Sequence, residues 1–189
     1  MIKVGIQGGK GSFCEEAAEI FIKNHGLEQF KIEFLISSSG VLDNLEQKRI
    51  DYGVIAMENA QGGVVIESVE ALAHSKCKIV EMFHVPISQN LLALPGMHLG
   101  QISEIHSHQQ ALRQCRNYLA EHFWTRPLIE TDDTAESARR LKEGKLPENA
   151  AVIGNHNCAE LYDLIILEKN IHDLKNNLTL FLGLKHLAD

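Results

Sequence analysis

The sequence predicts an α/β protein made of two similar lobes with a central cleft. Its 189 residues, 44% hydrophobic and 23% charged, have the composition of a folded globular protein with a sizeable core. Short apolar runs alternate with amphipathic segments, which is typical of βαβ units. The alternation begins again near residue 88, so we expect one domain over residues 1–189. In it, one lobe comprises about residues 1–87 plus 178–189, and the other about residues 88–177.

The first lobe is predicted from apolar runs that end in turn residues. The opening run ends at Gly8, Gly9 and Gly11, after which Ser12 begins a helical stretch. The segment 51–57, which is apolar after Asp51, predicts a buried strand of a parallel sheet. The expected strands lie at residues 1–7, 31–37, 51–57 and 78–85, and the expected helices at 15–25, 40–49 and 65–74.

The second lobe repeats this pattern. A second continuous apolar run, at residues 150–154, again predicts a buried strand. The expected strands lie at residues 88–94, 105–107, 128–130 and 150–154, and the expected helices at 109–123 and 134–142. No Gly/Ser-rich linker separates the halves. We therefore expect the chain to cross between the lobes near residues 85–89 and to return near 176–179.

Charge and composition exclude several classes of function. The net charge is −7, and the densest basic stretch, around Arg139 and Arg140, is diluted by glutamates, so we expect no nucleic-acid binding. The start resembles no signal peptide, and no apolar run approaches the ~20 residues of a membrane span. We therefore expect a cytoplasmic protein with no membrane association. The four cysteines form no Cys-x-x-Cys pair, which favours reduced structural thiols.

Polar residues and glycines follow the predicted strands, where an α/β sheet binds its ligands. Helix N-termini at this edge present free backbone N–H groups and the positive end of the helix dipole. We expect Ser12 and Thr134 to be helix N-caps. The spacing of the glycines matches neither phosphate-binding loop, so a carboxylate is the expected anion. The positions concerned are Gly11, Ser12, Phe13, Ser107, His108, Thr134 and Ala135.

A His-x-His pair, His106 and His108, raises the alternative of a metal site. A protein zinc site needs three or four converging ligands, and the sequence offers no further ligand at metal-site spacing beside this pair. We therefore expect no metal, and we expect the two histidines to be surface or loop residues.

Six segments together resemble the prephenate dehydratase family, in that family's order. They are Gly8-Gly-Lys-Gly-Ser-Phe, Asp51-Tyr-Gly-Val-Ile-Ala-Met-Glu-Asn, Ser107-His-Gln-Gln-Ala-Leu-Arg-Gln-Cys, Asp133-Thr-Ala-Glu-Ser-Ala, Ala159-Glu-Leu-Tyr and Asn176-Asn-Leu-Thr-Leu-Phe. The resemblance implies a fold similar to type II periplasmic binding proteins. It also implies conversion of prephenate to phenylpyruvate with loss of CO2 and water, in phenylalanine biosynthesis. It implies no cofactor and a possible homodimer. The sequence ends soon after Phe181, so we expect it to lack the ACT-type regulatory domain that commonly follows in the family.

The resemblance also suggests roles for individual residues. Thr179 matches the family's hydroxyl donor to the departing hydroxyl, and Asn59 and Gln110 match neutral amides that orient the substrate. Each has a structural alternative: a strand threonine, a helix cap and a first-turn helix residue. The expected substrate-binding residues are Gly11, Ser12, Phe13, Glu58, Ser107, His108, Thr134, Ala135 and Phe181.

Several positions depart from the family pattern near these residues. Leu180 replaces the arginine of Thr-Arg-Phe, and Ala60 and Val64 replace serines. Gln89 replaces a histidine, and Gln109 a proline. Two alternatives therefore stay open beside the dehydratase: a non-catalytic module that binds a small carboxylate, and a decarboxylase that keeps the ring hydroxyl. Retention of Thr179 argues against the decarboxylase, whereas loss of the arginine and both serines favours the binding module. The expected partner is prephenate or phenylpyruvate.

Overall fold

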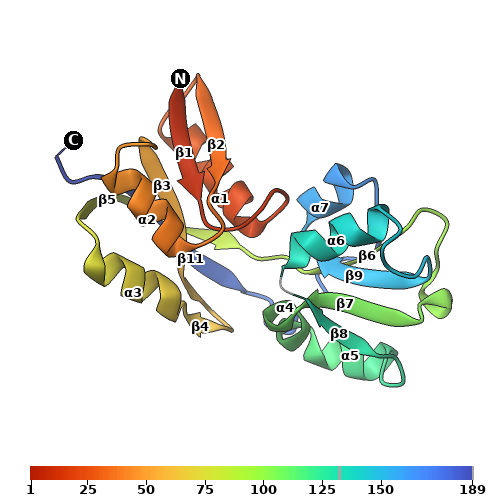
Figure 1. Cartoon of the computed structure of the whole chain (residues 1–189). Helices are drawn as coiled ribbons and strands as arrows, with labels where there is room; N and C mark the ends of the chain where they lie inside the picture. The colour runs from red at the N-terminus through yellow and green to blue at the C-terminus, as the bar shows by residue number, and fades with distance from the viewer. Residues whose placement is uncertain (132, 189) are drawn as a thin grey trace. The chain divides into compact units, whose positions relative to one another are not determined.

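The computed structural model describes residues 1–131 and 133–188, and the chain divides into two compact units (Figure 1). Unit 1 comprises Met1–Pro86 and the C-terminal stretch that begins at Leu178, and unit 2 comprises Ile87–Asn177. Each unit has one β-sheet with helices on both faces. The predicted α/β class with two sheets is confirmed.

Unit 1 is a mixed sheet in the order β2-β1-β3-β11-β5, with β4 paired to β3. Strands β1, β2 and β3 are parallel, and β11 lies antiparallel between β3 and β5. The beginning of β11 therefore lies at the carboxyl edge of β1 and β3. The strands are β1 Ile2–Ile6, β2 Phe30–Phe34, β3 Tyr52–Asn59, β4 Gly63–Val64, β5 Cys77–Pro86 and β11 Leu178–His186. The helices are α1 Phe13–Asn24, α2 Ser38–Glu46 and α3 Ile66–His74.

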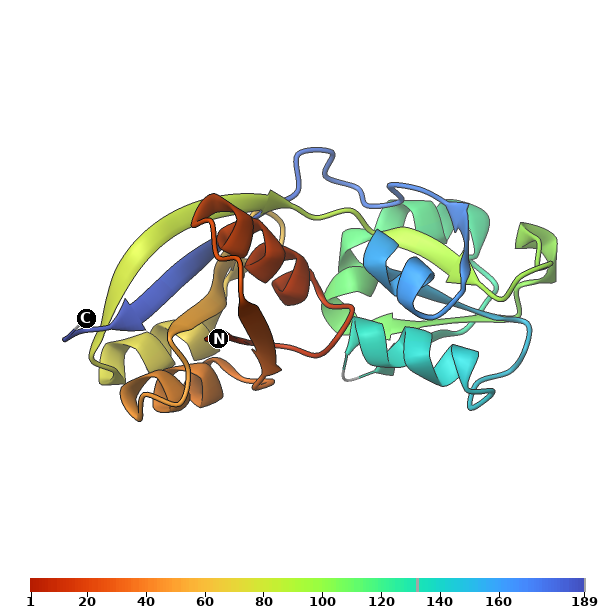
Figure 2. The same ribbon diagram turned by 90° about the horizontal axis from the view of Figure 1, so that it is seen from above.

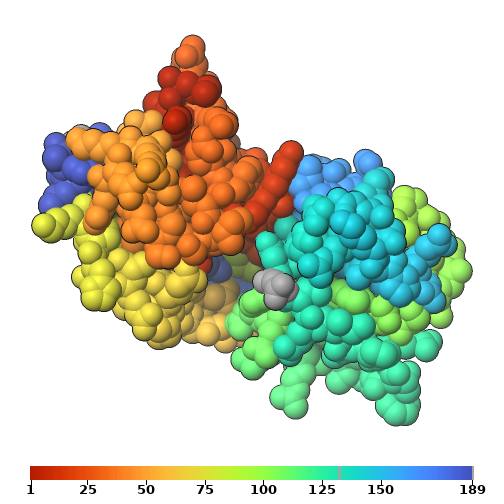
Figure 3. All heavy atoms as spheres, in the orientation of Figure 1, coloured from red at the N-terminus to blue at the C-terminus, as the bar shows by residue number. Residues whose placement is uncertain are grey.

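The helices of unit 1 cover both faces of its sheet, as the second view shows (Figure 2). Helix α1 packs its buried face, which includes Phe21, on Val54 and Phe181. Helix α2 packs on Ile55 and Leu182 from the other face. Neighbouring side chains of β11 thus point to opposite faces, as the pleat of a strand requires. In the space-filling view, the orange and yellow regions that contain α2 and α3 cover much of the visible surface of this unit (Figure 3).

Unit 2 has a five-stranded sheet in the order β10-β6-β9-β7-β8. Strand β7 is parallel to both β8 and β9, whereas β6 is antiparallel to its neighbours. Helices α4 and α5 cover one face, and α6 and α7 cover the other. The strands are β6 Asn90–Ala93, β7 Glu104–His108, β8 Leu128–Thr131, β9 Ala150–Gly154 and β10 Ile165–Glu168. The helices are η1 Leu99–Gln101, α4 Gln109–Gln114, α5 Arg116–His122, α6 Thr134–Lys142 and α7 His156–Leu161.

The prediction of one helix over residues 109–123 is wrong, because the helix breaks at Cys115. The backbone N–H of Asp173 donates to the Gln114 carbonyl at 2.7 Å, so this carbonyl is bonded from outside the helix. The Asp173 carboxylate then accepts from the Asn117 N–H at 3.1 and 3.2 Å and caps α5. A segment distant in sequence thus interrupts the helical ladder, and no local pattern indicates it.

The cysteines Cys14, Cys77, Cys115 and Cys158 are all free. Burial raises the pKa of the Cys115 thiol well above its usual value, so this thiol stays protonated and unreactive. Among the residues that the structure describes, no helix is long and apolar enough to cross a membrane.

Candidate functional site

Thr179 and Asn59 form a hydrogen-bonded pair at the carboxyl edge of the unit 1 sheet. They are register partners on β11 and β3. The Asn59 side-chain amide donates from Nδ2 to Thr179 Oγ1 at 2.9 Å. Asn59 Oδ1 accepts from the backbone N–H groups of Gln61 and Gly62 at 3.0 and 2.8 Å. These two bonds orient the amide so that its NH2 group faces the threonine.

This orientation defines what the threonine hydroxyl can do. Because Thr179 Oγ1 accepts a hydrogen from Asn59, its own hydrogen is available to be donated elsewhere. A hydroxyl that accepts a hydrogen bond is polarised and becomes a better donor. Thr179 is 6% exposed, so little water competes for that hydrogen. The pair is therefore a pre-oriented, uncharged hydrogen-bond donor.

The N-terminus of α1 lies after β1, at the same edge of the sheet. Ser12 is its N-cap, as predicted, and accepts from the Glu15 N–H at 3.4 Å. The Gly11 N–H donates to the Glu15 carboxylate at 2.6 Å, and the Ser12 N–H donates to the Gly9 carbonyl at 3.2 Å. Two of the amides predicted to bind a carboxylate are thus engaged within the chain, one of them by a carboxylate.

The other predicted residues of unit 1 divide between its surface and its core. Glu58 is exposed on β3, directly opposite Leu180 of β11. Phe181 is 1% exposed, with its ring 6.0 Å from that of Phe83 in the core. Phe181 therefore packs in the core, on the same face of β11 as Thr179. Its contact with a substrate stays a prediction.

In unit 2, three predicted residues occupy the turn from β7 into α4. Ser107 is fully buried, and its hydroxyl donates to the Ile153 carbonyl at 3.0 Å. His108 is the N-cap of α4, and its Nδ1 accepts from the Gln110 N–H at 3.2 Å. Gln110 is half-buried in the first turn of that helix. The turn places all three at the carboxyl edge of the unit 2 sheet.

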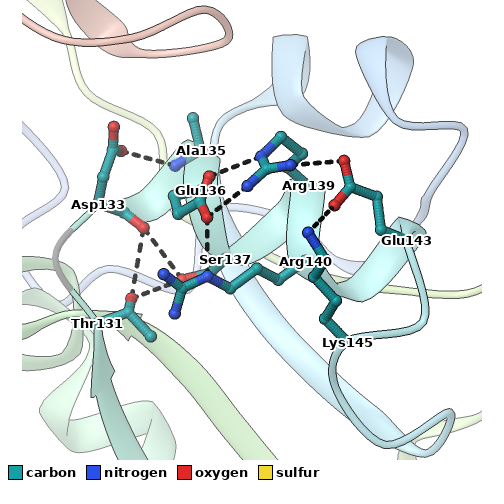
Figure 4. Close-up of polar contacts among 9 residues, drawn as sticks. All are labelled: Thr131, Asp133, Ala135, Glu136, Ser137, Arg139, Arg140, Glu143 and Lys145. Atoms are coloured by element: carbon teal, nitrogen blue, oxygen red, sulfur yellow. Dashed lines mark hydrogen bonds and ion pairs between the residues drawn. The ribbon is translucent and has the colours of Figure 1, made fainter.

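The prediction of Thr134 as an N-cap is wrong, because the N-cap of α6 is Asp133 (Figure 4). The Asp133 carboxylate accepts from the Ala135 N–H at 2.8 Å. Both residue types are good N-caps, and adjacent candidates cannot be ranked from the sequence. The extended backbone of Asp133, with φ −148° and ψ 142°, identifies it as the cap. The Ala135 amide is thus also engaged by a carboxylate of the chain.

The basic stretch on α6 is paired internally, as Figure 4 shows. Arg139 donates to Glu136 at 2.7 Å and to Glu143 at 2.6 Å, and Arg140 donates to Glu136 at 2.8 Å. The hydrogen bonds from Arg139 and then Arg140 lower the pKa of Glu136 to about 2. Glu136 therefore stays ionised near neutral pH, and these guanidinium groups are already engaged with carboxylates.

Asn155 also lies at the carboxyl edge of the unit 2 sheet, and it was not among the predicted site residues. It is the N-cap of α7, where its Oδ1 accepts from the Cys158 N–H at 2.8 Å. It is 2% exposed, and its Nδ2 has no hydrogen-bond acceptor among residues 1–131 and 133–188. A buried donor without a partner is costly, and such groups mark candidate ligand contacts. The sequence signal was its place directly after the buried strand at 150–154.

The two histidines of the His-x-His pair have different surroundings. No cluster of three or more metal-ligating side chains occurs within residues 1–131 and 133–188. His106 is not the surface or loop residue that was expected. It is 6% exposed on β7, and its Nε2 lies 2.7 Å from Glu104 Oε1. His108 is exposed and caps α4.

Comparison with known proteins extends these observations. A family model described as prephenate dehydratase matches residues 4–188. A prephenate dehydratase of Lactococcus lactis is 38% identical over 95% of this chain and 62% of its own length. The crystal structure of an Arthrobacter aurescens prephenate dehydratase in complex with L-Phe matches with a TM-score of 0.86 and 26% identity. The match covers 98% of this chain and 60% of that one.

A second likeness concerns the fold alone. A nutrient-binding protein of Burkholderia cenocepacia, solved with bound methionine, matches with a TM-score of 0.57 and 15% identity. The match covers 100% of this chain and 86% of the other. The predicted similarity to periplasmic binding proteins is thus confirmed at the level of fold. The chain spans about three fifths of the length of the two prephenate dehydratases.

Proposed function

Because the chain belongs to the prephenate dehydratase family, we propose that it converts prephenate to phenylpyruvate with loss of CO2 and water, in phenylalanine biosynthesis. The observation that carries this proposal is the pair of Asn59 and Thr179. Its donor is uncharged, oriented and shielded from water, and it lies at the edge where α/β sheets bind small molecules.

In the proposed reaction, Thr179 donates a hydrogen bond to the ring hydroxyl as that group departs. Its pKa is too high for it to act alone as an acid, so it polarises the leaving oxygen or relays a proton to it. The electron pair of the breaking carbon–carboxylate bond moves into the ring and expels the hydroxyl, which takes up one proton from solvent and leaves as water. Loss of CO2 and water makes the ring aromatic, which supplies much of the driving force. Asn59 keeps the donor in place throughout.

In unit 1, the N-terminus of α1 is proposed to bind a substrate carboxylate. In unit 2, taken by itself, the N-terminus of α6 is proposed as a carboxylate contact. The Gly11 N–H already donates to the Glu15 carboxylate, and the Ala135 N–H donates to the Asp133 carboxylate. A substrate carboxylate that binds either amide would therefore displace a carboxylate of the chain. Within unit 2, Gln110 and Asn155 Nδ2, which has no acceptor among the described residues, are proposed as further neutral donors to a carboxylate. Neutral donors suit this chemistry, because charge leaves the reacting carboxylate in the transition state.

An ultraviolet assay with purified protein and prephenate tests the proposal by following phenylpyruvate. We expect catalysed formation of phenylpyruvate above the spontaneous rate. Binding of prephenate without turnover would instead identify the chain as a carboxylate-binding module. A decarboxylated product that keeps the ring hydroxyl would identify the decarboxylase. Either result would overturn the proposal.

Substitution Leu180→Arg restores the arginine of the family's Thr-Arg-Phe pattern and tests whether its replacement by leucine affects catalysis. Leu180 is opposite Glu58 on β3 and His84 on β5, on the face of β11 opposite to Thr179. A guanidinium there is expected to pair with the exposed Glu58, which adds little energy at a surface. We therefore expect kcat and KM for prephenate to stay within about threefold of wild type. A tenfold fall in KM would show that an arginine at this position binds the substrate.

A cellular location and an oligomeric state are also proposed. A cytoplasmic enzyme is proposed because the substrate is a small charged metabolite and the described residues contain no membrane-spanning helix. Homodimer formation, which the family resemblance implies, stays a prediction. Sedimentation velocity over a range of protein concentrations would test it.

A further inference from the structure

A groove of about 470 Å³ in unit 2 is lined by residues of α4, α5, the segment that follows α5 and the edge strand β8. Its apolar surface comes from Leu119, Phe123 and Leu128, the last on the edge strand β8. Arg113, Arg116 and Arg126 also line it, together with Trp124, and we call it the arginine groove. Its volume lies within the ~300–1,000 Å³ of pockets that hold small organic ligands.

The charges of the arginine groove are unbalanced. Among the ion pairs of the described residues, none involves Arg113, Arg116 or Arg126. The carboxylate at the rim, Glu130, accepts hydrogen bonds from Gln109 at 3.2 and 3.3 Å. The arginines of α6, in contrast, are paired with glutamates. In a chain of net charge −7, three unpaired guanidinium groups around one groove indicate an anionic ligand.

The exposed apolar side chains of the arginine groove further define the class of ligand. Trp124 is 80% exposed, although indole is among the side chains with most to gain from burial. Leu128 beside it is 45% exposed. A flat apolar group placed in the groove would cover both side chains while its charged end reaches the guanidinium groups. A purely polar anion would leave this apolar surface in water.

Two other occupants fit less well. A second copy of the chain, related by a twofold axis through the groove, would bring two sets of three guanidinium groups together, and like charges repel. A nucleic acid would need a basic surface far larger than this groove, on a chain whose net charge is −7.

We propose that the arginine groove binds a small aromatic carboxylate, with the guanidinium groups on the carboxylate and the Trp124 indole against the ring. The site lies wholly within unit 2 and uses neither Thr179 nor Asn59. It therefore stands independently of the proposed catalytic activity, and its failure would leave that activity untouched.

Fluorescence of Trp124 gives a direct test, because this is the only tryptophan in the chain. We titrate the full chain with 3-phenylpropionate and expect a saturable change in the fluorescence. We expect 3-phenylpropan-1-ol, which lacks the charge, and propionate, which lacks the ring, to bind at least about tenfold more weakly. Equal responses to all three compounds, or no saturable response to 3-phenylpropionate, would overturn the proposal.

Matched arginine variants locate the site. Arg116→Gln and Arg113→Gln are exposed changes that should leave the fold intact, as circular dichroism would verify. We expect each to weaken 3-phenylpropionate binding about five- to tenfold by calorimetry. Arg49→Gln removes an exposed arginine of unit 1 and should leave the affinity unchanged. Unchanged affinity in both groove variants would refute the assignment. Self-association abolished by these variants would identify a chain–chain interface instead.

Discussion

Replacing Thr179 with valine is expected to lower the kcat for prephenate by about 10²- to 10³-fold, equivalent to ~2.7–4 kcal/mol, as for other donors that stabilise developing charge. Valine keeps the shape of threonine but removes the hydroxyl that accepts from Asn59 and donates to the leaving oxygen. Because that donation strengthens only as charge develops, the loss should appear in kcat more than in KM. Steady-state assays of phenylpyruvate formation measure both constants.

Two further variants separate catalysis from stability. Thr179→Ser keeps a hydroxyl and should recover most of the lost kcat. Thr125→Val removes an exposed threonine of unit 2 and should leave kcat unchanged. The thermal midpoint of each variant shows whether the protein is still folded. If Thr179→Val turns over prephenate as fast as wild type, the assignment of the catalytic residue is wrong.

Replacing Gly183 with alanine is expected to cost unit 1 about 1–3 kcal/mol of unfolding free energy, as overpacking of cores commonly does. Gly183 lies on β11 against Phe21, and an added Cβ would overlap the edge of that ring. Phe21 is fully buried, with the rings of Tyr52 and Phe83 centred 5.5 and 6.3 Å away. The ring therefore cannot move without disturbing the packing of α1.

Gly100→Ala provides the matched control, because a Cβ at that position meets no atom within 4 Å. Its effect should stay within about 0.5 kcal/mol. Urea unfolding followed by far-ultraviolet circular dichroism compares the two variants. Equal midpoints would show that α1 and β11 adjust to the extra methyl group and that the close approach of Phe21 is not needed.

Several features could be predicted from the sequence because local pattern determines them. The buried strand at 150–154 and the helix at 134–142 have the predicted bounds, since an apolar run and an amphipathic repeat each end at clear polar boundaries. Ser12 caps α1 as predicted, because its hydroxyl accepts from the backbone N–H of Glu15, three residues later. The family motifs also indicated Asn59 and Thr179, which are 120 positions apart and pair in the structure.

The sequence by itself thus determined the α/β class, most strands and helices, and the family, because these depend on short-range periodicity and on motifs in order. Only the tertiary structure decided where long-range contacts override that pattern. Asp173 divides α4 from α5, and the pairing of β3 with β11 places Leu180 beside Glu58 and away from the face of Thr179. The arginine groove likewise exists only because α4, α5 and β8 pack together, which no single segment encodes.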